Sequence, residues 1–303
     1  MTDPSTKWRG PPSDADHSEH PRTVVYWKNT LGARKAPSRG QKHHPLLRIQ
    51  EEIPWRSRAA LLVIGLAIPF GLWAALAHSN GGSIVVPSPA QTWGGAKRLW
   101  HEGVLGGDLW ASCRRILIAY AISMAVAVVI GLLMGTFRSF DSFMEPPIGF
   151  MRYVPATALI PLLLTWQGID ELPKITMIVL GSVFFNILMV ADVARTVPRD
   201  MVNASYTLGA GRITVLRRVI LPHSVPGIID VARINLAAAW SILVVAELLA
   251  AESGLAFRIT RAQRFRQVDE TFAILIIFGI IGVGSDLFLR SLRRRAAPWA
   301  VGA

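Results

Sequence analysis

The residues of this sequence that could do chemistry are charged side chains set within apolar stretches. Arg233, Trp240 and Glu247 follow one another at intervals of seven residues inside a largely apolar stretch. Seven residues of an α-helix return to nearly the same direction, so the three side chains are expected on one helix face over about 21 Å. Such a stripe cannot face lipid. It either lines a pathway for an anion or is buried against charges on neighbouring helices, and both interpretations stay open.

Two further groups are candidates for contact with a solute or a partner. Ser112 and Arg115 lie at the start of another apolar stretch and join the candidates for a translocation path. Arginines also gather in a short segment near residue 260, where concentrated positive charge can steer an acidic protein partner. The residues of this candidate docking cluster are Arg258, Arg261, Arg264 and Arg266.

The elements that must position these residues are long apolar segments. The chain has 303 residues, of which 51% are hydrophobic and only 17% charged, below the ~25% of an ordinary soluble domain. As helices, the apolar segments reach across a hydrocarbon core of about 30 Å. We therefore predict an all-α polytopic membrane protein with six transmembrane helices, which excludes a simple soluble enzyme. The predicted spans are residues 59–77, 116–137, 153–169, 175–191, 228–250 and 271–289.

Two details of these spans bear on packing. The third and fourth spans are separated by a turn-like segment at 170–173, which predicts a helical hairpin. Gly131 and Gly135 lie one helical turn apart in the second span, a pattern that lets two membrane helices pack backbone to backbone. We interpret the two glycines as scaffold.

Several function classes are excluded by what the sequence lacks. The single cysteine, Cys113, cannot form an internal disulfide or a thiolate metal site, and the histidines of the N-terminal tail have no acidic or thiolate partners at fixed spacing, so we expect no metal. The net charge of +12 lies in tails and loops that flank the spans, which argues against nucleic acid as a partner. No phosphate-binding Gly-x4-Gly-Lys-Ser/Thr motif occurs, so the chain is not expected to hydrolyse ATP or to hold a cofactor itself.

The distribution of lysine and arginine predicts the orientation. Basic residues are more frequent in the segments that face the same side as the two termini, which places both termini in the cytoplasm. Residues 1–55 are predicted to form a disordered basic tail that is attracted to anionic membrane lipid. Residues 56–299 form the transmembrane domain, and residues 300–303 the C-terminal end.

The loop at 195–227, between the fourth and fifth spans, is too long and too patterned for a passive connection. Pro198 is suited to open a short helix, and Gly209 to close it in the left-handed conformation. A second short helix is expected over about 212–220, ending before Pro222. Small side chains allow close approach of a partner, and Tyr206 and Leu208 provide apolar anchors.

The same loop resembles the cytoplasmic signature of permease subunits of ATP-binding-cassette (ABC) importers. That signature is Glu-Ala-Ala, three residues, Gly, nine residues, then Ile-x-Leu-Pro. Here Asn203-Ala204-Ser205, Gly209 and Val219-Ile220-Leu221-Pro222 stand at these positions, with Asn203 in place of the acidic residue. The resemblance implies a type I importer permease fold whose coupling helix sits in a cleft of an ATPase. The coupling residues that it implies are Asn203, Ala204, Ser205, Leu208, Gly209, Ala210, Leu221 and Pro222.

Other segments resemble the nitrate, sulfonate, taurine and bicarbonate branch of this family, among them Pro87-Ser-Pro at 87–89, Leu221-Pro-His-Ser-Val-Pro at 221–226 and Ala246-Glu247. Asn186 stands where the branch commonly has proline, which predicts a straighter fourth span. The branch implies a permease subunit in the bacterial inner membrane that forms the path for a small anionic solute. Its implied partners are a second copy of the permease, two separate ATPase subunits that bind ATP and magnesium, and a periplasmic or lipid-anchored solute-binding protein.

One alternative function is a secondary transporter driven by an ion gradient. In that case Asp192, Glu247 or Asp286 would be a proton or sodium site. The six spans show no internal repeat of the kind such transporters often have, which favours the importer.

Overall fold

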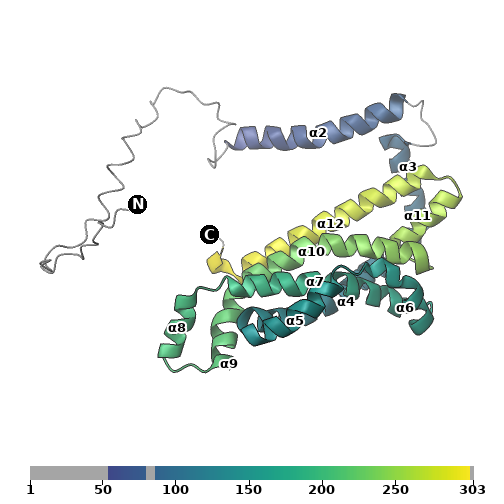
Figure 1. Cartoon of the computed structure of the whole chain (residues 1–303). Helices are drawn as coiled ribbons and strands as arrows, with labels where there is room; N and C mark the ends of the chain where they lie inside the picture. The colour runs from purple at the N-terminus through teal and green to yellow at the C-terminus, as the bar shows by residue number, and fades with distance from the viewer. Residues whose placement is uncertain (1–53, 80–85, 301–303) are drawn as a thin grey trace, which may run out of the picture. The chain divides into compact units, whose positions relative to one another are not determined.

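The apolar stretches form long helices in the computed structural model, which describes residues 54–79 and 86–300 (Figure 1). Every regular element among these residues is a helix, which confirms the predicted all-α class. The long helices are α2 (Trp55–Ser79), α4 (Val104–Thr136), α7 (Glu171–Arg195), α10 (Leu221–Ala250) and α12 (Val268–Ala296). The shorter elements are α3 (Pro89–His101), α5 (Arg138–Met151), η2 (Ala156–Leu159), α6 (Ile160–Gln167), α8 (Arg199–Thr207), α9 (Arg212–Val215), the π-helical turn η3 (Leu216–Ile220), α11 (Leu255–Arg264) and η4 (Pro298–Ala300).

The chain divides into two compact units, Met1–Ala67 and Ile68–Ala303. The described part of the first unit is residues 54–67, which begin α2. The predicted tail, 1–55, lies outside the described residues except for Pro54 and Trp55, and so does the segment 301–303.

Among the described residues, five helices are long and apolar enough to cross a membrane, and the pair α5 and α6 makes a sixth span if it is counted as one. This pair is bent by 74° at its break. The predicted third span, 153–169, is therefore wrong as a single continuous helix. Pro155 precedes a 3-10 turn, and α6 has only 8 residues, about 12 Å of helix, which is too short to cross a hydrocarbon core.

Helices α4 and α7 pack backbone to backbone. A Cβ atom added to Gly131 would lie 2.7 Å from the carbonyl oxygen of Ile187, and one added to Gly135 would lie 2.5 Å from the Cβ of Ala194. Real Cβ atoms do not approach other heavy atoms so closely, so only glycine permits this separation of the two helices. The interpretation of the two glycines as scaffold agrees with this contact.

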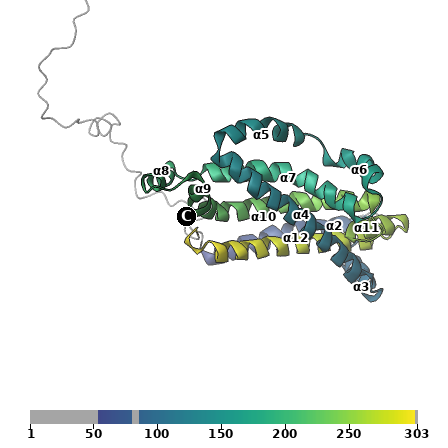
Figure 2. The same cartoon turned by 90° about the horizontal axis from the view of Figure 1, so that it is seen from below.

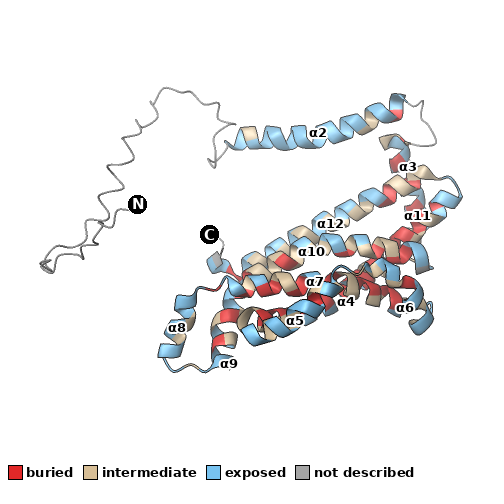
Figure 3. Ribbon diagram, in the orientation of Figure 1, coloured by how far each residue is buried: buried red, intermediate tan, exposed pale blue. Residues whose placement is uncertain are grey.

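Within the unit Ile68–Ala303, helices α4, α7, α10 and α12 run side by side between two ends (Figures 1 and 2). The end formed by α8, α9 and the adjoining ends of α4, α5 and α7 is called the α8 end here. The end formed by α3, α11, the first turns of α4 and α7 and the last turns of α10 is called the α11 end. Buried residues occur along α4, α7 and α11, whereas α8 has none (Figure 3).

Candidate functional site

The loop predicted to contact an ATPase forms two short helices at the α8 end. Pro198 precedes α8, as expected from a residue without a backbone N–H group. The helix closes where the amide of Gly209 donates to the carbonyl of Tyr206 at 2.9 Å and the amide of Ala210 donates to that of Ser205 at 3.0 Å. Gly209 has a φ of 82°, so the expected left-handed conformation is confirmed.

The expected end of the second helix before Pro222 is wrong. The chain passes from α9 through the π-helical turn Leu216–Ile220 and continues into α10 as one segment, Arg212–Leu249. Proline in a regular helix lacks a donor and collides with the carbonyl four residues earlier. The wider π turn directly before Pro222 relieves this conflict, so the helix continues where the sequence predicted a stop.

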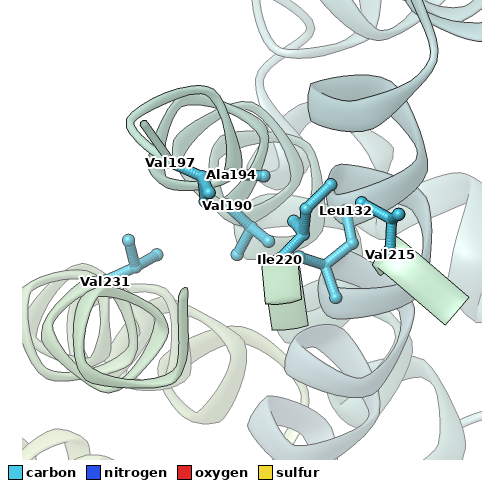
Figure 4. Packing of buried hydrophobic residues seen from close by; sticks show 7 residues of the cluster. All are labelled: Leu132, Val190, Ala194, Val197, Val215, Ile220 and Val231. Atoms are coloured by element: carbon cyan, nitrogen blue, oxygen red, sulfur yellow. The ribbon is translucent and has the colours of Figure 1, made fainter. Parts of the chain in front are cut away.

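Apolar contacts fix the second helix to the bundle (Figure 4). Val215 and Ile220 are 2% and 6% exposed and belong to one buried cluster with residues of α4, α7 and α10. The remaining members of this cluster are Leu132, Val190, Ala194, Val197 and Val231. Ala210 and Leu221 pack against it, so these two predicted coupling residues contact the protein's own core.

Helix α8 contrasts with this anchored segment. Asn203, Ala204 and Gly209 are exposed, and Ser205 is half-buried. Leu208 is 87% exposed, an unusual position for a leucine at the tip of a short helix. The α8 end therefore exposes an apolar side chain and small side chains on α8, and the segment that follows α8 is packed into the core of the bundle.

At the α11 end, most of the predicted translocation residues are buried in one polar cluster. Ser112, Arg115 and Glu247 are 0%, 1% and 0% exposed. Nη1 of Arg115 lies 2.7 Å from Oε1 of Glu247, and both Nε and Nη2 of Arg115 lie 2.6 Å from the carboxylate of Glu171. The hydroxyl of Ser112 donates to the same oxygen of Glu247 at 2.7 Å.

The cluster also holds the connection between α10 and α11. The second oxygen of Glu247 accepts the amide of Ala256 at 3.0 Å, and the hydroxyl of Ser112 accepts the amide of Leu255 at 2.9 Å. A Cβ at Gly254 would lie 2.5 Å from the Glu247 carboxyl group, so glycine is required there. Ser112, Arg115 and Glu247 thus join four helices and offer no surface to a solute, which favours the structural alternative for them.

The other predicted path residues lie apart from this cluster. Arg233 pairs with Asp286 at 3.1 Å and with Asp230 at 3.5 Å, and its side chain is 24% exposed. Trp240 lines an apolar groove between α4, α10 and α12 and meets Phe278 edge to face. The seven-residue stripe is therefore not one continuous surface.

One of the four predicted docking arginines is also buried. Arg258 is 8% exposed and pairs with Asp108 of α4 at 2.6 Å, so its inclusion in a docking cluster is corrected. Asp108 in turn accepts the amide of Gly254 at 2.9 Å. Arg261, Arg264 and Arg266 are exposed at the α11 end.

A buried chain of uncharged polar groups was not found from the sequence. The amide of Asn186 donates to Ser123 of α4 at 3.0 Å and accepts from Asn235 of α10 at 2.7 Å. Asn186 lies inside the uninterrupted helix α7, which agrees with the expected effect of replacing proline. The signal that could have revealed it is the pair Ser182 and Asn186, one helical turn apart in an otherwise apolar span.

Comparisons with known proteins agree with this geometry. Residues 127–298 match the family described as binding-protein-dependent transport system inner membrane component. A probable ABC transporter permease protein of Brucella melitensis is 38% identical over 239 residues, which are 79% of this chain and 96% of that protein. The taurine transport system permease protein TauC of Escherichia coli is 34% identical over 261 residues, 82% of this chain and 94% of that one.

A solved structure supports the fold. A chain of the MetNI methionine ABC transporter, in inward-facing conformations, matches with a TM-score of 0.60 at 16% identity, over 65% of this chain and 97% of that chain. Sequence, fold and the spacing of the α8 segment therefore lead to one assignment. This chain belongs to the family of binding-protein-dependent inner-membrane transport components and is an ABC importer permease subunit of the nitrate, sulfonate and taurine branch.

Proposed function

We propose that this permease forms the translocation path for a small anionic solute or a zwitterion with an anionic group, such as nitrate, an aliphatic sulfonate or taurine, and is moved by separate ATPase subunits that bind α8. The name of the Escherichia coli relative supports a sulfonate-type solute. In this proposal two copies of the chain form the path, and each α8 seats in one ATPase, which binds the ATP and magnesium.

The observation that carries the proposal is the contrast within the α8 end. Leu208, at the end of α8, is an apolar side chain that is 87% exposed, and α8 has no buried residue. Directly behind it, Val215 and Ile220 are packed in the core of the bundle. A short helix that exposes an apolar anchor fits a groove in a partner protein, and its rigid attachment lets a push on the helix reach α7 and α10.

The orientation follows from the same proposal. The α8 end would face the cytoplasm, where ATP is available, and the α11 end would face the solute-binding protein. Arg261, Arg264 and Arg266 are the exposed cations that this end offers to an acidic partner surface. Arg233 and Trp240 remain the candidates for contact with the solute.

The ion pairs argue against transport driven by an ion gradient. Glu247 is paired with Arg115, Asp286 with Arg233 and Arg290, and Asp192 with Arg195. An arginine bound to a carboxylate competes with a transported proton or sodium ion for the same oxygen atoms. Each acidic residue considered for the alternative function is held in this way.

The test is capture of the proposed separate ATPase subunit by the purified full-length permease, with Leu208→Glu as the variant. Placing a charge at the tip of α8 is expected to weaken capture at least about tenfold, because a carboxylate would be buried in an apolar groove. Phe265→Glu is the matched control, since Phe265 is 67% exposed at the opposite end. Equal capture by both variants and the wild type would refute the role of α8.

A transport assay separates the two functions. Permease, ATPase and binding protein are reconstituted in vesicles, and uptake of radioactive taurine is followed with ATP or with an imposed ion gradient. Uptake that requires ATP and is lost in Leu208→Glu supports the proposal. Uptake that persists with the gradient alone would support the secondary transporter.

A further inference from the structure

The α8 end contains a hollow of about 630 Å³ to which the proposed coupling role assigns no ligand. It lies between α8 and the adjoining ends of α4, α5 and α7. Its lining includes Val197, Val215 and Ile220 of the buried apolar cluster and polar side chains from all four helices. The volume is within the ~300–1,000 Å³ of typical small-molecule sites.

The charge of the walls is positive. Arg138, Arg195 and Arg199 line the hollow together with one acidic residue, Asp141. Arg195 is neutralised, because it pairs with Asp141 at 2.5 Å and with Asp192 at 2.7 Å. Neither Arg138 nor Arg199 has a side-chain hydrogen bond or ion pair within residues 54–79 and 86–300. The guanidinium groups of Arg138 on α5 and Arg199 on α8 therefore have no anionic partner in the described part of the chain.

The other polar groups are donors of hydrogen bonds. The hydroxyl oxygen of Thr136 is buried at the wall and has no hydrogen-bond partner in the described part of the chain. Buried polar atoms in proteins are normally paired, so an unpaired one beside a hollow indicates a missing ligand or water. Asn203 and Tyr206 of α8 add an amide and a phenol to the same lining.

We infer that this hollow binds a small oxyanion, a phosphate, sulfate or sulfonate group, held between Arg138 of α5 and Arg199 of α8. Guanidinium groups match the oxygens of such anions in geometry and charge, and Thr136, Asn203 and Tyr206 can donate to the remaining oxygens. The anion can be a free ion of the surrounding solution or the phosphate of a membrane lipid headgroup, and both present the same chemistry. A bound anion would link α8 to α5 and restrict the movement of α8.

This restriction has a consequence that rests on the proposed function. If an ATPase moves the bundle through α8, an anion that ties α8 to α5 opposes that movement. An accumulated anionic solute would then slow its own import from the α8 side. The binding site itself does not depend on the ATPase, so it can be tested on the permease alone.

The first experiment measures binding of radioactive sulfate to the full-length permease in lipid-free detergent by equilibrium dialysis, at constant ionic strength set with chloride. Saturable binding is expected, and Arg138→Gln and Arg199→Gln are each expected to weaken it at least about tenfold by removing a charged donor. Arg212→Gln is the matched control, because Arg212 is exposed at the same end but does not line the hollow. Its affinity should stay within about twofold of the wild type.

The second experiment identifies the source of the anion. Sulfate binding is repeated in nanodiscs of phosphatidylcholine and of phosphatidylglycerol. Equal binding in both supports a free anion, and loss of binding only in phosphatidylglycerol supports a lipid headgroup in the same hollow. Hydrogen exchange of the α8 amides should slow with sulfate in the wild type and not in Arg138→Gln.

Absence of saturable sulfate binding in detergent would overturn the inference, and so would equal affinity in all three arginine variants. Both outcomes are independent of ATPase capture by α8. Arg138 and Arg199 are exposed, so the variants are expected to fold, and the wild-type elution volume in size-exclusion chromatography verifies this.

Discussion

The two ends of the bundle differ in how deeply their charged contacts are buried. At the α11 end, Arg115 and Glu247 are almost fully buried and join α4, α7 and α10 through charged hydrogen bonds of 2.6 to 2.7 Å, and Glu247 accepts the amide of Ala256 in α11 at 3.0 Å. At the α8 end, the segment from α9 to α10 is held by hydrocarbon contacts, and α8 itself buries no residue. Charged networks depend strongly on geometry, whereas apolar contacts tolerate small displacements.

This difference assigns different tasks to the two ends. The α11 end can move only as one body, because separating its helices would leave buried charges without partners. At the α8 end, α8 itself can shift relative to a partner, while Val215 and Ile220 keep the following segment attached to the core. A permease moved by a partner protein needs both properties. The α8 end would contact the partner, and the α11 end would keep the helices fixed relative to one another.

The largest effect is expected from Arg115→Met at the α11 end. Without Arg115, Glu247 remains a buried carboxylate with no cation, which should destabilise the fold by about 3–5 kcal/mol. Arg114→Met is the matched control on the same helix. Arg114 is 50% exposed and 3.8 Å from Glu171, so its loss should cost at most about 1 kcal/mol.

The measurement is thermal unfolding of both variants in detergent. Adding Glu247→Gln to Arg115→Met should restore part of the lost stability, because it removes the unpaired charge. Similar unfolding midpoints for Arg114→Met and Arg115→Met would show that the α11 end does not depend on its buried ion pair.

A smaller effect is expected where α4 and α7 touch between the two ends. In Gly131→Ala the new methyl group would meet the backbone of Ile187 at 2.7 Å, so the helices must separate, at a cost of about 1–3 kcal/mol. Gly149→Ala is the control in α5, since nothing lies within 4 Å of its added Cβ. There the better helix propensity of alanine should stabilise slightly, by up to about 1 kcal/mol. Unfolding midpoints that shift in the same direction would contradict the close packing of α4 and α7.

Local features of this fold could be predicted from the sequence, and contacts between distant segments could not. The left-handed Gly209 and the helix start after Pro198 follow from backbone preferences of single residues. Close packing of the second span against another helix follows from the spacing of Gly131 and Gly135, although the spacing does not identify that helix as α7. Each of these predictions depends only on residues close together in the sequence.

The failures have a common cause in long-range structure. Arg115 and Glu247 are 132 residues apart, so their pairing could not be read from either segment. The sequence around Arg258 favours an exposed position, because its partner Asp108 is 150 residues away. Pro222 does not end its helix, because the π turn before it relieves the clash between the proline ring and the preceding helical turn. No local sequence rule predicts this π turn.

The smallest effect tests whether the α8 end is as independent as its contacts suggest. Gly209→Ala forces a Cβ into the left-handed region, which should cost about 1 kcal/mol, and the cost should fall on α8 alone because no atom of the bundle lies within 4 Å of that position. Hydrogen exchange of the α8 amides should therefore accelerate about fivefold, while the unfolding midpoint of the bundle hardly changes. Gly211→Ala is the control, since Gly211 has a φ of −76° that alanine adopts freely and the same open surroundings. If Gly209→Ala instead lowered the midpoint of the whole bundle, α8 would be part of the cooperative core, and the contrast between the two ends would fail.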